Sequence, residues 1–127
     1  MQLITSAQTL TASWVDLGAE LDMSSYKRAL IWINLDINDS LNARVRALGK
    51  LANNATLEYS FPIKVVGSSD VKVDDEYIEF NVDADQQMIL EVETNGLIPF
   101  LQFQIQAGTA GVAPGQFDNA DATFSNL

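Results

Sequence analysis

The stretch that decides the fold is Arg28-Ala29-Leu30-Ile31-Trp32-Ile33-Asn34-Leu35-Asp36-Ile37. Every second residue from Ala29 to Ile37 is apolar, whereas the residues between them are mixed and include charged and amide side chains. Successive side chains of a β-strand point to opposite faces, so this period of two predicts a long strand with one face in a hydrophobic core. Trp32 falls on the opposite, partly polar face, which suits a subunit interface or contact with a second sheet.

The same alternation recurs along the chain, and residues typical of turns separate the apolar runs. The expected strands are Leu101–Ala107, Tyr77–Val82, Met88–Glu93, Thr9–Leu17, Thr56–Val66, Val71–Val73 and a short closing strand around Asp121–Asn126. Pro62 implies an edge strand or a bulge, and the glycine-rich stretch 108–115 is expected to be a surface loop. These features predict one all-β domain over residues 1–127, an antiparallel β-sandwich that is jelly-roll-like and has about eight strands.

Residues 41–52 allow two interpretations. Leu41, Val45, Leu48 and Ala52 have helical spacing, and Asp39 or Ser40 is a suitable helix cap. A strand instead places Ala43, Val45 and Ala47 inward, with Arg44 and Arg46 outward. We favour the strand, because both neighbouring segments are strands and a hairpin is the shorter connection.

The composition argues against an enzyme. The 127 residues include no histidine and no cysteine, so the Ser-His-Asp and Cys-His arrangements and the usual zinc sites are excluded. Only a carboxylate-based or lysine-based mechanism stays open. Glu91 and Glu93 share a strand face, and Trp14, Trp32 and Tyr77 are potential sugar platforms, but two glutamates on a solvated strand face are the simpler interpretation. We therefore predict no catalytic residues and no cofactor.

Charge limits the classes of partner. The net charge is −10, and all seven basic residues lie before residue 73, whereas ten acidic residues follow it. Nucleic-acid binding needs a basic surface, so no nucleic-acid partner is expected. No signal peptide is recognisable, and no apolar run approaches the roughly 20 residues that span a bilayer, so no membrane partner is expected either. Acidic residues in 36–40 and 70–76 offer oxygen ligands for calcium, but neither segment fits an EF-hand loop, and we predict no metal site.

Four residues are candidates for an interface. Gln102, Gln104 and Gln106 form a neutral row on one strand face, which is less costly to bury against a partner than a charged row, although an ordinary exposed face fits equally well. Trp32 is the fourth candidate. With Trp14 it is also a candidate for a carbohydrate-binding face, but packing in the core or in an interface is the simpler expectation for both rings.

Two segments resemble small β-sandwich virion proteins of tailed bacteriophages: residues 13–26 running into Leu30–Ile33, and the closing stretch Ile98–Gly111. Proteins of this kind decorate or cement capsids, often as trimers, or serve as neck, tail or fibre accessories. The resemblance implies a non-enzymatic capsid decoration protein that self-associates, with a trimer favoured, and that binds the major capsid protein or another virion protein. It would be made in the bacterial host cytoplasm and reside in the virion. The alternative is a lectin-like, carbohydrate-binding module, with or without calcium.

Overall fold

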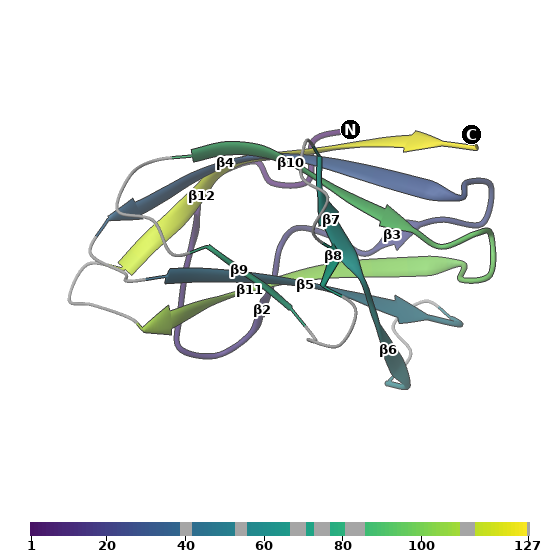
Figure 1. The fold of residues 1–127 in the computed structure, drawn as a ribbon, viewed down its shortest axis with the longest axis horizontal. Helices are drawn as coiled ribbons and strands as arrows, with labels where there is room; N and C mark the ends of the chain where they lie inside the picture. The colour runs from purple at the N-terminus through teal and green to yellow at the C-terminus, as the bar shows by residue number, and fades with distance from the viewer. Residues whose placement is uncertain are drawn as a thin grey trace.

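A computed structural model of the chain describes residues 1–38, 42–52, 56–66, 71–72, 77–80, 86–109 and 114–126. Throughout these ranges the regular secondary structure is β, and it forms two antiparallel sheets that pack face to face (Figure 1). Sheet A consists, in spatial order, of β1 (Gln8–Thr9), β12 (Pro114–Ser125), β4 (Arg28–Asn38), β10 (Gln86–Glu93), β7 (Ile63–Val65) and β8 (Val71–Lys72). Sheet B consists of β2 (Val15–Asp16), β11 (Phe100–Thr109), β5 (Asn42–Lys50) and β6 (Glu58–Phe61), with β3 (Leu21–Asp22) on β11 and β9 (Ile78–Phe80) on β5.

Eight of these strands have the connectivity of a jelly roll. Counted in chain order, the eight are β1, β2, β4, β5, β6, β10, β11 and β12. They pair as nested hairpins, the first with the last (β1 with β12), then β2 with β11, β4 with β10, and β5 with β6. The pairs β12–β4 and β11–β5 join neighbouring hairpins and complete the two sheets. The sequence-based prediction of a jelly-roll-like sandwich is therefore confirmed.

The strand count was predicted too low, because two expected strands are each divided in two and one strand was missed. About eight strands were expected, whereas the residues that the structure describes form twelve. The expected strand Thr9–Leu17 is β1 and β2, the expected strand Thr56–Val66 is β6 and β7, and β3 was not predicted. The short strands β8 and β9 lie within the expected strands Val71–Val73 and Tyr77–Val82.

The hydrophobic core lies between the sheets and consists of the inward-facing half of each long strand. On β4 the side chains of Ala29, Ile31, Ile33 and Leu35 are buried. On β11 the alternating Leu101, Phe103, Ile105 and Ala107 are buried in the same way. The alternation in the sequence therefore identified both core-facing rows correctly. Removal of these side chains from water is the main favourable contribution to folding.

Several boundaries differ from the predictions. The expected strand Thr9–Leu17 is two short strands, β1 in sheet A and β2 in sheet B, because the chain crosses between the layers there. The closing strand is not short: β12 has twelve residues. Parts of the expected loop 108–115 belong to β11 and β12, and the rest of that loop lies outside the described residues.

Residues 42–50 form strand β5, so the strand interpretation of this segment is confirmed. Val45 and Ala47 face the core, and Arg44 and Arg46 face outward. Pro62 lies between β6, at an edge of sheet B, and β7 in sheet A. The missing N–H of proline suits this position, where the chain leaves one sheet for the other.

Candidate functional site

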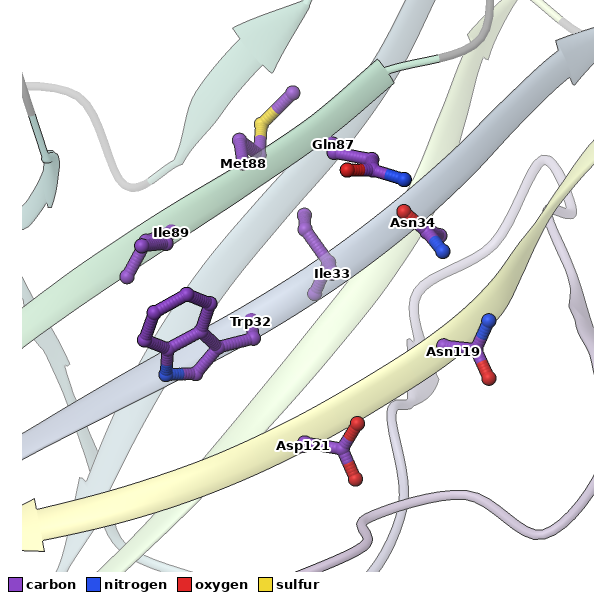
Figure 2. A pocket seen from close by; sticks show the side chains of 8 residues that line it. All are labelled: Trp32, Ile33, Asn34, Gln87, Met88, Ile89, Asn119 and Asp121. Carbon is purple, nitrogen blue, oxygen red and sulfur yellow. The ribbon is translucent and has the colours of Figure 1, made fainter.

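The outer face of sheet A carries a shallow pocket of about 330 Å³ (Figure 2). Its lining comes from three adjacent strands, β4, β10 and β12: Trp32, Ile33, Asn34, Gln87, Met88, Ile89, Asn119 and Asp121. Ile33 and Met88 pair with each other on the core side of the sheet, and the strand register places the other six side chains in two rows across the outer face. One row is Ile89, Trp32 and Asp121, and the other is Gln87, Asn34 and Asn119. We call this site the Trp32 pocket.

Trp32 is the largest group in the pocket, and strand geometry exposes it. Its neighbours Ile31 and Ile33 both point into the core, so Trp32 must point outward. The residue is 49% exposed, a large apolar area to leave in contact with water. Figure 2 shows the indole ring broadside, between Ile89 on one side and Asp121 on the other. About half of the residue's surface is therefore accessible to a ligand.

The polar groups of the Trp32 pocket keep their hydrogen-bonding capacity. They are the carboxamides of Asn34, Gln87 and Asn119 and the carboxylate of Asp121. Over the part of the chain that the structure describes, none of these side chains hydrogen-bonds to another residue. Each carboxamide offers both a donor and an acceptor, and the carboxylate offers acceptors only. The pocket can therefore both donate to and accept from a polar ligand.

The outer face of sheet B carries a second cluster, in which two arginines of β5 contact two aromatic rings. The guanidinium of Arg46 lies over the ring of Trp14, 4.3 Å from its centroid, and that of Arg44 lies 4.8 Å from the ring centroid of Tyr77. The two aromatic ring centroids are 5.8 Å apart. These are favourable cation–π distances. We call this cluster, together with Gln104 and Gln106, the arginine–aromatic face.

Hydrogen bonds hold the arginines and glutamines of this face in place. Arg46 donates from Nε and Nη2 to Oε1 of Gln104, at 2.8 and 2.6 Å. Arg44 donates from Nε to Glu79 at 2.8 Å and from Nη1 to Gln106 at 3.2 Å. The hydrogen bond with Glu79 raises the pKa of Arg44 above its ordinary value.

The amide nitrogens of the two glutamines also have partners within the chain. Gln104 donates to the Asp16 carboxylate and Gln106 to the backbone carbonyl of Ala12, both at 2.8 Å. Two of the predicted interface residues therefore lie on one outer face, with side chains already fixed. This is the opposite of the Trp32 pocket, where the carboxamides have no such partners.

Gln102 does not lie on that surface. It is 3% exposed, and its amide donates to the backbone carbonyls of Gly18 and Phe103, at 3.2 and 2.9 Å. The connection between β2 and β3 covers it, because the two strands pair with β11 on either side of Gln102 and the carbonyl of Gly18 between them accepts from its amide. Alternation gave the direction of the side chain correctly but does not reveal a covering segment.

The residues of the suggested paired-acid site are divided between the two layers. Glu91 and Glu93 form ion pairs with Arg28, at 4.0 and 3.7 Å, and neither lines the Trp32 pocket. Trp14 and Tyr77 contact the arginines of sheet B, and so lie on the other layer. Much of both calcium candidates lies outside the described part of the chain. In the segment 36–40 this applies to residues 39 and 40, and in the segment 70–76 it applies to residue 70 and to residues 73–76.

Within the described ranges, no three His, Cys, Asp or Glu side chains form a group that would hold a metal ion. A search of the same residues finds no helix long and apolar enough to cross a membrane. Comparison with known proteins finds no family model, no curated protein and no solved structure that matches the chain.

Proposed function

We propose that this protein is a non-enzymatic structural protein of a tailed-bacteriophage virion, a capsid decoration or cementing protein that self-associates and binds the particle surface. The resemblance of residues 13–26 and 98–111 to such proteins suggests the setting. Jelly-roll sandwiches are common among viral capsid domains and lectins, which is consistent with this role, although a fold alone does not decide a function. The observation that carries the proposal is the arginine–aromatic face.

The arginine–aromatic face has the composition of a protein-binding hot spot. Trp, Tyr and Arg are the residue types that contribute most to binding when they lie at the centre of an interface. Here two arginines contact one tryptophan and one tyrosine, and their positive charges are balanced by Asp16 and Glu79 nearby. Because the charges of this face are balanced within the protein, docking does not leave a net charge buried against the partner.

Preorganisation adds to this suitability. Long side chains such as Arg and Gln lose conformational entropy when a partner immobilises them, about 0.5–1.5 kcal/mol each. On this face Arg46 and Gln104 already hold one another, and Gln106 is bonded to Arg44 and to the backbone. Most of that ordering is therefore complete before a partner arrives.

The mechanism is stabilisation by added interface area. A protein that binds only the assembled shell shifts the equilibrium toward that shell, in proportion to its affinity and concentration. Self-association strengthens the effect, because a trimer that engages several capsid subunits at once binds far more tightly than one protomer. A trimer is the arrangement that the resemblance favours.

The test uses phage heads that lack this protein, produced by deleting its gene from the phage that encodes it. Purified full-length protein should co-sediment with these heads and should be oligomeric by light scattering. Arg46→Ala should weaken binding by at least about tenfold, since it removes a hot-spot contact and releases Gln104. Lys64→Ala is the matched control, because it removes one positive charge from sheet A and should bind like wild type.

Thermal unfolding of each variant checks that it is folded. A strictly monomeric protein with no affinity for the heads would contradict the proposal. So would unchanged binding by a folded Arg46→Ala variant.

A further inference from the structure

We infer that the Trp32 pocket is a binding site for a neutral pyranose saccharide. The inference is independent of the proposed virion role, because it concerns the opposite outer face of the sandwich. It rests on three observations: the exposed indole of Trp32, the unpaired polar side chains around it, and the absence of basic residues from the lining that the structure describes.

The indole ring supplies a platform for one side of a sugar ring. A pyranose presents C–H groups on its faces and hydroxyl groups around its edge. The face of an aromatic ring is the negative end of its quadrupole and attracts such weakly positive C–H groups, in addition to the gain from burying apolar surface. Trp32 presents its ring broadside at one side of the pocket (Figure 2). The flanking Ile89 extends the apolar part of the platform.

The polar side chains are placed to bind the hydroxyl groups at the sugar edge. Asp121 lies beside Trp32 on β12, and the Gln87–Asn34–Asn119 row follows one step along the sheet. A hydroxyl both donates and accepts, so carboxamides and a carboxylate are suitable partners for a ring that carries several of them. The contrast with sheet B is informative, because there Gln104 and Gln106 already have intramolecular partners.

Other ligand classes fit this pocket less well. A phosphate or acidic sugar would meet the Asp121 carboxylate with no Lys or Arg in the lining to balance it. A wholly apolar ligand would desolvate three carboxamides without replacing their hydrogen bonds to water. A cationic side chain would use Trp32 and Asp121 alone and leave the carboxamides unpaired. The pocket volume of about 330 Å³ is at the lower end for ligand sites, which suits a monosaccharide or disaccharide.

The test is a direct titration of the full-length protein with defined sugars. The probes are the methyl pyranosides of glucose, galactose, mannose and N-acetylglucosamine, with N-acetylneuraminic acid and a short arginine-rich peptide as charged comparisons. Binding is measured by calorimetry and by tryptophan emission. At least one neutral pyranoside should bind at millimolar concentrations and change the emission, because the sugar covers Trp32.

Substitutions then locate the site. Trp32→Ala should weaken binding by at least about tenfold, through loss of the stacking platform. Asn119→Ala should weaken it roughly fivefold, the effect of one hydrogen bond. Tyr59→Ala is the matched control, because Tyr59 is an equally exposed aromatic residue on β6, outside the pocket, and it should leave affinity unchanged.

Two kinds of result would overturn the inference. One is that none of the four neutral pyranosides binds at millimolar concentrations, or that the acidic sugar or the cationic peptide binds more tightly than they do. The other is sugar binding that survives Trp32→Ala in a variant whose circular dichroism and thermal unfolding match those of the wild type.

Discussion

At the scale of single residues, two glycines show how the surroundings of a backbone position decide its tolerance. Gly18 and Gly96 have nearly the same left-handed backbone, with φ values of 71° and 74°. Their surroundings differ: a Cβ on Gly18 would collide with the backbone carbonyl of Leu3, whereas on Gly96 it would meet only the Lys27 side chain at 3.8 Å. The pair therefore separates backbone strain from steric collision.

We expect Gly96→Ala to lower the free energy of unfolding by about 1–2 kcal/mol, from left-handed strain alone. Gly18→Ala should lower it by at least about 1 kcal/mol more, because the backbone of Leu3 has to move as well. Urea denaturation of the two variants and wild type measures both values. Equal losses of unfolding free energy in the two variants would show that the backbone around Leu3 moves aside at no measurable cost and would contradict the prediction.

At the scale of elements, a buried ion pair fastens the connection between β2 and β3 to the end of β5. Lys50 Nζ lies 2.9 Å from Glu20 Oε2, and the two side chains are only 12% and 9% exposed. Lys50→Met should lower the free energy of unfolding by about 3 kcal/mol, because it removes the cation that lies beside the buried Glu20 carboxylate and 3.8 Å from Glu58. The measurement is equilibrium denaturation at neutral pH.

Glu93→Gln is the matched control for this prediction. It breaks the Arg28–Glu93 pair, whose 3.7 Å separation and 53% exposed glutamate place it in water, so it should change stability by no more than about 0.5 kcal/mol. The double substitution Glu20→Leu with Lys50→Met should recover much of the loss, since neither charge then remains buried. A loss for Lys50→Met no larger than that for Glu93→Gln would disprove the buried-pair account.

The elements also show what a period of two can and cannot predict. β4 was predicted almost to its ends, because its inward and outward residues alternate without interruption. β12 was predicted only from Asp121 onward, because it contains a bulge: Phe117 and Ala120 both face the core although they are three positions apart. A bulge adds one residue to a strand and puts the pattern before it out of step with the pattern after it. The first half of β12 therefore did not read as a strand.

The same limit explains why the candidate site was only partly predicted. Trp32 and Asn34 were placed on one face from β4 alone. Ile89 and Asp121 join them through the register of β10 and β12 with β4, which links residues more than fifty positions apart. Hydrophobic periodicity is a local signal and contains no register between distant strands. The pairing of Arg44 and Arg46 with aromatic rings was missed for the same reason.

At the scale of the whole molecule, the acidic C-terminal half is divided unevenly between the layers. Of the acidic residues after residue 73 that the structure describes, Glu91, Glu93, Asp118 and Asp121 lie on β10 and β12 of sheet A, whereas only Glu79, on β9, lies in sheet B. The two outer faces thus differ in chemistry: sheet A presents carboxylates and free carboxamides around Trp32, and sheet B presents the ordered arginine–aromatic face. The two proposed binding sites therefore lie on separate sides of the molecule.

From this two-sided arrangement we expect a head-bound molecule to capture a saccharide at the same time. The two sites lie on opposite faces of a sandwich whose sheets pack about 10 Å apart, so a partner on one face does not cover the other.

Heads decorated with wild-type protein should be retained on beads that carry the neutral pyranoside bound best in titration, and undecorated heads should pass through. Trp32→Ala should decorate heads normally but lose retention. Arg46→Ala should bind the beads as free protein but fail to bring heads with it, because substitutions on separate faces act independently. Loss of both activities in either variant, with the fold intact, would show that the two faces are coupled and would contradict a two-sided adaptor.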